Sequence, residues 1–341
     1  MLRPRRSLIA SSLIGCHFSR TTVRSSFTSL LGVPSVRNLS DSRAAASAAA
    51  TTEPGTTTTT DAPLTIKNVP GNYKIETYLS KINDPWANLA FEEWLFRNSD
   101  PETYILFMYR NSKSVIIGRN QNPWKECNLK LLEQDSIPFV RRKSGGGTVY
   151  HYLKVDKTSL ESKGTPSVRS PVTRLRESSF TIDHLSFCEA VRTEFLKRYG
   201  YEQWRQNMEG EPVIVDEAMI EGNENVKAIR DDMKTWAWMY GQSPQFTYRL
   251  EKAFPWGSVN VLITSKEGLI TQVDMDSIDH STNAQRLPLT ALAVGLEGQR
   301  YERNALDLAI ERIREEAPEV LSPKGAVEEI RDVARWLKDE I

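Results

Sequence analysis

The stretch "RRKSGGGTVYHYLKVDKTSLESKG", residues 141–164, changes character half-way along its length. Its first half resembles the end of a basic strand and runs into three consecutive glycines, Gly145, Gly146 and Gly147. Glycine has no Cβ, so backbone N–H groups in such a run can approach a ligand closely. The second half is a lysine-rich polar run with no evident secondary structure. The question is what the glycines are built to hold.

The residues beside the glycines point to an anion. Arg141, Arg142 and Lys143 precede them, and Ser144 adds a hydroxyl group. Positive charge next to bare amides suits a phosphate or an adenylate. The stretch is not a P-loop, because no GK[ST] follows, and it is not a GxGxxG motif. A structural turn with basic neighbours explains the same residues, so both interpretations stay open at this point.

The composition of the whole chain is that of an ordinary globular protein of two domains. Of its 341 residues 39% are apolar and 26% charged, and the formal net charge is zero. No global field therefore recruits nucleic acid or an anionic membrane, and no apolar run approaches the length of a membrane span. The cysteines Cys16, Cys127 and Cys188 show no metal-ligand spacing. They also form no even-numbered disulfide framework, which indicates a reducing compartment. We expect Cys188 to be a small buried side chain.

The N-terminus differs from the rest. The first forty residues carry six arginines and no acidic residue, with serine, threonine and leucine between them. This is the composition of a mitochondrial transit peptide, and a disordered basic tail is the alternative. We assign residues 1–43 to the transit peptide, which predicts the mitochondrial matrix, and residues 44–62, rich in alanine and threonine, to a low-complexity linker.

The body of the chain shows a mixed α and β pattern. β-rich apolar runs predict strands over residues 65–80, 102–110, 114–120 and 137–144. Helical spacing predicts helices over residues 84–99, 123–134, 186–200, 302–317 and 325–340. Asp84 suits an N-cap and Pro85 a first turn, and a hairpin over residues 258–275 is expected to turn at Glu267 and Gly268. Polar and acidic residues suggest a boundary between residues 200 and 230.

Three stretches, in this order and spacing, resemble the lipoate–protein ligase A family, and its fungal mitochondrial members above all: "NLAFEEWLF" (88–96), "IIGRNQNPWKECN" (116–128) and "RRKSGGGTVYH" (141–151). Residues 160–200 are similar to the end of that family's catalytic domain and residues 236–277 to its C-terminal accessory domain. The resemblance implies a mixed α/β biotin/lipoate-ligase fold, similar to class II synthetases, with a small α+β accessory domain. It places the catalytic domain at 63–205 and the accessory domain at 230–341.

The resemblance also implies a reaction. Lipoate attacks the α-phosphate of ATP, in the presence of Mg²⁺, to give lipoyl-adenylate and pyrophosphate. The acyl group then passes to a lysine of a lipoyl domain, as in the E2 subunits of 2-oxoacid dehydrogenases or the glycine-cleavage H protein. No nucleic acid, membrane or protein-bound metal is implied. The residues implied for ATP and the adenylate are Arg142, Ser144, Gly145, Gly146, Gly147, Thr148, Val149, Tyr150 and His151. Those implied for the lipoate pocket are Arg119, Asn120, Gln121, Asn122 and Trp124.

The sequence departs from the family after His151. In the family, a K-x-SG-x-A motif beyond the glycines carries the catalytic lysine. Here the glycine motif is followed directly by a stretch that resembles the family sequence beyond that motif. None of Lys154, Lys157 and Lys163 lies in such a motif. We therefore expect a catalytic domain truncated after residue 151, with apolar surface left exposed. A coding segment lost in gene prediction is the simplest cause, and a genuine truncation is the alternative.

Other functions remain open. The missing lysine favours an inactive homologue that binds nucleotide or an acceptor protein. Octanoyl transfer would use a cysteine nucleophile together with a lysine, and neither Cys127 nor Cys188 lies in a suitable setting. Biotin ligation shares the fold but lacks the accessory domain.

Overall fold

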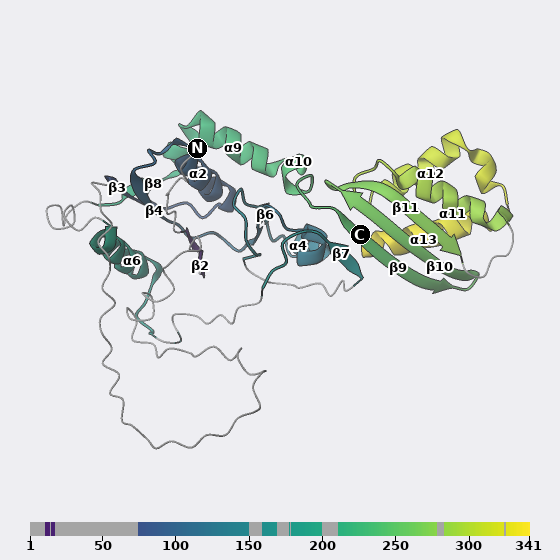
Figure 1. Cartoon of the computed structure of the whole chain (residues 1–341), viewed down its shortest axis with the longest axis horizontal. Coiled ribbons are helices and arrows are strands. Elements are labelled where there is room, and N and C mark those ends of the chain that lie inside the picture. The colour runs from purple at the N-terminus through teal and green to yellow at the C-terminus, as the bar shows by residue number, and fades with distance from the viewer. Residues whose placement is uncertain are drawn as a thin grey trace, which may run out of the picture.

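The protein is described by a computed structural model that covers residues 74–149, 159–168, 177, 179–199, 211–277, 283–323 and 325–341. Two short N-terminal strands, β1 (Ser11–Leu13) and β2 (Gly15–His17), are also assigned and pair antiparallel. The rest of the predicted transit peptide, the linker and residues 65–73 lie outside the described residues. The chain folds into two parts that lie next to each other along its longest axis (Figure 1).

The first part is built on a parallel sheet. Its strands, in the order β4-β3-β8, are β4 (Thr103–Met108), β3 (Lys74–Ser80) and β8 (Val213–Val215). Helix α2 (Pro85–Asn98) joins β3 to β4, as predicted. The Asp84 side chain accepts hydrogen bonds from the backbone amides of Trp86 at 2.7 Å and Ala87 at 3.1 Å, so the predicted cap is confirmed.

Helices pack against both faces of the edge strand β4. All residues of β4 are buried. Ile105 and Phe107 join the cluster formed with α2 and α9 (Glu224–Lys234), whereas Leu106 and Met108 pack with α6 (His184–Tyr199). The helix predicted over residues 186–200 is thus present and begins two residues earlier. A strand buried on both faces accounts for the continuous apolar run in the sequence.

A second, smaller parallel pair consists of β5 (Val115–Ile117) and β6 (Phe139–Arg141). The single helix predicted between them, over residues 123–134, is wrong: the structure has α3 (Pro123–Glu126) and α4 (Leu129–Gln134). Cys127 is extended, and the Asn128 side chain accepts a hydrogen bond from the Leu131 amide at 3.1 Å. Asn128 therefore starts a new helix where the pattern suggested a continuous one.

The second part is an antiparallel sheet in the order β11-β10-β9-β7. Its strands are β7 (Leu160–Ser162), β9 (Phe246–Phe254), β10 (Gly257–Lys266) and β11 (Leu269–Ser277). The predicted hairpin is confirmed: Glu267 and Gly268 turn with φ of 54° and 73°. A Cβ on Gly268 would lie 2.9 Å from the ring of Trp236, so the turn needs glycine for space as well as for its backbone angle.

Helices α11 (Asn283–Leu296), α12 (Ala305–Glu316) and α13 (Ala326–Glu340) complete the second part, together with a short 3₁₀ helix (Pro318–Leu321). The two helices predicted near the C-terminus are confirmed. The sequence analysis missed α11, which contains Pro288, a residue that usually marks a helix end. None of the helices in the described ranges is long and apolar enough to cross a bilayer.

The segment between the two sheets belongs to the first part. Helices α8 (Glu217–Glu221) and α10 (Trp236–Met239) flank α9, β8 pairs with β3, and α9 packs against α2. The boundary expected between residues 200 and 230 therefore falls among elements of the first part. Strand β7, in contrast, lies early in the sequence but pairs with β9 of the second part. The domain limits given above stay a prediction.

Candidate functional site

The glycine motif follows β6 and folds back over the end of β5. Val149 and Ile116 exchange backbone hydrogen bonds of 2.8 and 3.2 Å, which close the loop onto the strand. A Cβ on Gly118 would lie only 2.0 Å from the carbonyl oxygen of Gly146. Gly146 itself has a φ of 96°, in the region that favours glycine. Glycines from two separate motifs are therefore needed to build this one loop, residues 144–148, which we call the glycine loop.

Arg142 holds the glycine loop from its buried side. Its Nη2 donates to the carbonyl of Gly145 at 2.7 Å and to that of Gly147 at 2.8 Å. The amide groups of Gly145 and Gly146 make no hydrogen bond within the described part of the chain, and both residues are exposed. The loop thus directs carbonyls to Arg142 and offers amide donors to a ligand. The implied contact between Arg142 and the adenylate stays a prediction. In the structure, the Nη2 of Arg142 binds the glycine loop.

A half-buried carboxyl group, that of Glu92, lies near Arg142, and the sequence analysis did not single it out. Glu92 of α2 accepts a hydrogen bond from the Tyr109 hydroxyl at 2.7 Å. Burial raises the pKa of Glu92 to about 7, against the opposing effects of Tyr109 and Arg142. Burial also lowers the pKa of Arg142. The signal in the sequence was an acidic residue directly after the apolar run of "NLAF", on a helix expected to face the core.

Gln121 ties the glycine loop to two other segments. Its Oε1 accepts from the Gly118 amide at 2.9 Å and the Thr148 hydroxyl at 3.0 Å. Its Nε2 donates to the Ser167 hydroxyl at 2.9 Å and the Thr165 carbonyl at 3.2 Å. Because this buried amide is fully used inside the protein, the acyl-pocket role implied for Gln121 finds no support here. It acts as a positioning residue for the loop.

The other residues implied for the lipoate pocket divide into two groups. Arg119 and Asn120 are exposed on the turn after β5. Asn122 caps α3, and Trp124 is buried against three aromatic rings, with centroids 5.0 to 5.6 Å away: Tyr240, Phe246 and Tyr301. Trp124 therefore belongs to the core of the second part, and its implied role in the lipoate pocket stays a prediction.

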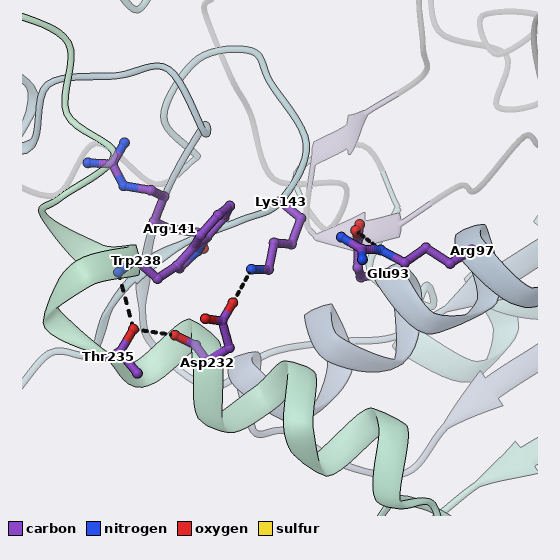
Figure 2. A network of polar contacts seen from close by, with 7 residues as sticks. All are labelled: Glu93, Arg97, Arg141, Lys143, Asp232, Thr235 and Trp238. Atoms are coloured by element: carbon purple, nitrogen blue, oxygen red, sulfur yellow. Dashed lines mark hydrogen bonds and ion pairs between the residues drawn. The ribbon is translucent and has the colours of Figure 1, made fainter. Parts of the chain in front are cut away.

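The basic residues before the loop are engaged within the protein. Arg141 is fully buried and donates to the carbonyls of Arg119, Gln121 and Met239 and to the Ser243 hydroxyl, at 2.6 to 3.0 Å. Lys143 points toward α9 and pairs with Asp232 (Figure 2). Other residues of the protein hold these two cations, which agrees with the interpretation of basic neighbours at a structural turn for Arg141 and Lys143. The acceptors of Arg141 are uncharged, however, so its positive charge is not neutralised by them, and burial lowers its pKa only to about 10.

Two family models match the chain, in the order of the two parts described above. The lipoyl protein ligase A/B catalytic domain matches residues 84–155, and the bacterial lipoate protein ligase C-terminus matches residues 243–331. Both matched stretches are domains of the lipoate–protein ligase family. The chain's mixed α/β fold with a C-terminal accessory domain is the one expected from the sequence.

Two solved structures of this family are similar to the chain. The crystal structure of P. falciparum LipL1 in complex with lipoate is 20% identical; the match covers 78% of this chain and 99% of that one, with a TM-score of 0.38. The crystal structure of lipoate-protein ligase A bound with ATP is 17% identical over 48% of this chain and 98% of that one, with a TM-score of 0.31.

The point at which the chain departs from the family pattern falls close to the end of the first match, at residue 155. Tyr150 and His151 of the implied adenylate site, and the nearby Lys154 and Lys157, lie outside the described residues. Lys163 is described, and its Nζ donates to the Gln245 side chain at 3.1 Å on the surface. Lys163 thus contacts the second part, and that it does not replace the family lysine stays a prediction.

The cysteines of this chain are poor nucleophile candidates. Burial raises the pKa of the Cys127 thiol to about 12, so it stays protonated at neutral pH. Cys188 is buried, as predicted, with its Sγ 3.7 Å from Nε2 of His184. In the described ranges no three His, Cys, Asp or Glu side chains gather into a possible metal site.

Apolar surface is open on the α6 side of the first sheet. A cavity of about 590 Å³ lies between α6 and the strands, lined among others by Leu79, Met108, Ile214 and Arg192. Leu185 and Val213 beside it are 64% and 46% exposed. The truncation of the catalytic domain after residue 151 stays a prediction.

Proposed function

We propose that this fold carries an ATP-dependent lipoate–protein ligase, which attaches lipoate to a lysine of a lipoyl-accepting protein. In the first step a carboxylate oxygen of lipoate attacks the α-phosphorus of ATP, and pyrophosphate leaves. In the second step the lysine amine attacks the acyl carbon of lipoyl-adenylate, and AMP leaves. Lipoyl domains of E2 subunits and the H protein are the acceptors we propose.

The observation that carries this proposal is the construction of the glycine loop. Arg142 draws the carbonyls of Gly145 and Gly147 to one side, and the exposed amides of Gly145 and Gly146 are left as donors. The uncompensated charge of Arg141 lies behind the same strand end. Amide donors held in place beside positive charge suit an α-phosphate whose negative charge must be stabilised during attack.

Mg²⁺ fits this proposal as a companion of ATP. It keeps several water ligands and binds to protein through one or two carboxylates and the phosphates of a nucleotide. Because the described residues offer no cluster of three or more ligating side chains, we assign Mg²⁺ to the triphosphate and not to a site of its own on the protein. Bound there, it would neutralise part of the phosphate charge.

We further propose that the chain in its present form binds nucleotide but turns over lipoate poorly. The lysine that would neutralise the reacting carboxylate and phosphate has no counterpart in the sequence. Removing one preorganised donor of this kind costs on the order of a hundredfold to a thousandfold in rate. The second candidate function, a binding protein without chemistry, is favoured by the same observation. Octanoyl transfer is disfavoured by the buried, protonated Cys127.

Lipoate-dependent ATP–pyrophosphate exchange tests the proposal. The chain as written is compared with one that regains a K-x-SG-x-A segment from the genomic sequence between the codons of His151 and Lys157. We expect exchange in the rebuilt chain only, and Arg142→Ala should abolish most of it because the glycine loop loses its internal support. Equal exchange by both chains would show that the lysine segment is not needed. An absence of exchange in both would contradict the ligase itself.

A further inference from the structure

The corner between α9 and α10 encloses the side chain that leads into the glycine loop. The Nζ of Lys143 lies 3.2 Å from the centre of the Trp238 ring and pairs with the carboxylate of Asp232 (Figure 2). Only 11% of the Lys143 side chain is exposed. An ammonium group between an aromatic face and a carboxylate is held from two sides, and this lysine stands two residues before Gly145.

The same corner also holds the backbone. Trp238 Nε1 donates to the carbonyl of Arg141 at 2.8 Å, so one indole ring contacts both Arg141 and Lys143, just before the glycine loop. Thr235 fixes the corner itself, because its hydroxyl donates to the Asp232 carbonyl at 2.7 Å and accepts from the Trp238 amide at 3.2 Å. Asp232 and Trp238 are thereby locked to each other although they belong to different helices.

A glycine loop needs such an anchor. Three successive glycines have no side chains with which to fix their own position and lose much entropy on ordering. Amide donors act on a developing charge only if they are held to within about half an ångström. The Arg141 guanidinium also donates to the Met239 carbonyl and the Ser243 hydroxyl. Residues 232–243 therefore contact the segment just before the glycine loop at several points.

We infer that Asp232, Thr235 and Trp238 form a clamp that sets the position of the glycine loop, and that Lys143 is a positioning residue for nucleotide binding, not a direct ligand of phosphate. The inference rests on the proposed function and extends it to a part of the chain outside the glycine motif. It also ties the nucleotide site to the segment that leads into the second part.

The direction in which Asp232→Asn changes the affinity for ATP distinguishes the clamp from direct phosphate binding by Lys143. If Lys143 bound phosphate directly, Asp232→Asn would free it and tighten ATP binding. If Lys143 positions the loop, Asp232→Asn loosens the loop and weakens binding. We expect the Kd for ATP, measured by calorimetry on the full chain, to rise by roughly three- to thirtyfold in Asp232→Asn and Trp238→Leu, the range that a cation–π contact of this kind represents.

Three comparisons isolate the effect. The Asp232 side chain is 56% exposed, so Asp232→Asn should leave the thermal midpoint of unfolding unchanged. An unchanged midpoint shows that weaker ATP binding does not come from a folding defect. Lys143→Arg, which keeps the charge over the Trp238 ring, should retain ATP binding, and Lys143→Met should lose it. Arg97→Gln breaks the ion pair between Arg97 and Glu93 on α2, also drawn in Figure 2, and should change nothing. Tighter or unchanged binding in Asp232→Asn overturns the clamp.

Amide exchange by NMR supplies a readout that needs no nucleotide. The Arg119 amide donates to the carbonyl of Ser144 at 2.9 Å and therefore reports whether the loop stays over the end of β5. We expect this amide to exchange severalfold faster in Trp238→Leu and Asp232→Asn, and at the native rate in Arg97→Gln. Native exchange in the first two variants refutes the clamp. If the native chain binds no ATP, the proposed function fails, but the exchange rates still decide on the clamp.

Discussion

Gly118 is the position at which the candidate site leaves least room. It belongs to the motif after β5, whereas its closest neighbour, the Gly146 carbonyl, belongs to the glycine loop. A side chain at Gly118 cannot be accommodated by rotation of the neighbour, because the atom it meets is backbone. The two motifs that the sequence shows separately are therefore parts of one contact.

We predict that Gly118→Ala displaces the glycine loop. Its Cβ would lie 2.0 Å from the Gly146 oxygen, a distance that no flexible side chain can relieve. Overpacking of this kind costs about 1–3 kcal/mol of unfolding free energy, measured by urea denaturation, and should abolish ATP binding. Gly145→Ala is the matched control for stability, because its Cβ meets no atom within 4 Å. Equal stability of the two variants would contradict the contact.

Glu92 should make stability depend on pH. Its pKa rises from 4.5 in a free side chain to about 7, so between these values the folded protein holds a proton that the unfolded chain releases. The contribution of this group to the unfolding free energy therefore falls as pH rises through this window and is constant above it. Glu92→Gln should remove the effect and gain about 1–3 kcal/mol over the native chain between roughly pH 5 and pH 8, measured by urea denaturation.

The neighbouring substitution Glu93→Gln serves as the control, because it removes a carboxylate from the same helix without touching Tyr109. A stability difference between Glu92→Gln and the native chain that stays constant with pH would refute the assignment of a raised pKa to Glu92.

At the scale of elements, α3 and β7 precede the boundary in sequence but pack with the second part. Trp124 of α3 lies in one apolar cluster with Phe246 and Tyr301, and Leu160 of β7 joins the same cluster. A strand and an aromatic ring that precede the boundary in sequence therefore complete the sheet and the core of the second part. We expect a fragment that begins at residue 230, where the predicted accessory domain starts, to be less stable alone than in the full chain.

Trp124→Ala tests this dependence in the intact protein. Deleting a buried tryptophan costs about 3–5 kcal/mol of unfolding free energy. Since its partners belong to the second part, we expect protease cleavage to increase between residues 240 and 341 rather than in α2. Trp94→Ala removes a partly buried ring of α2 from the other cluster and is the matched control. Cleavage confined to the first part in Trp124→Ala would show that the ring does not support the second part.

For the whole molecule, the N-terminal leader predicts where the protein works. A segment with six arginines and no acid among its first forty residues is drawn by the potential across the inner mitochondrial membrane. We propose the matrix as the location, and predict that N-terminal sequencing of the mitochondrial protein begins between about residues 35 and 62. A fusion in which these arginines are replaced by glutamine should stay in the cytosol. A native chain found in the cytosol with Arg3 still present would refute the proposal.

The sequence by itself determined the elements whose causes are local. Asp84 and Pro85 start α2, Glu267 and Gly268 turn the hairpin, and the apolar runs form buried strands, because caps, turns and strand patterns involve residues only a few positions apart. Where local signals competed, as at Asn128, the spacing of apolar residues alone gave the wrong helix length. The order of the motifs also indicated the family, which the two matched domains then supported.

Only the tertiary structure decided what the basic and polar residues of those motifs do. The carbonyl of Arg141 binds Trp238, and its guanidinium binds Ser243, across 97 and 102 positions of sequence. Gln121 reaches Ser167 across 46 positions. A cation or an amide in a motif has the same chemistry whether it faces a ligand or the protein's own carbonyls, and no local pattern distinguishes the two. The tertiary fold determines whether such a group faces a ligand or the protein, because a buried polar group must pair with a partner that the packing places beside it.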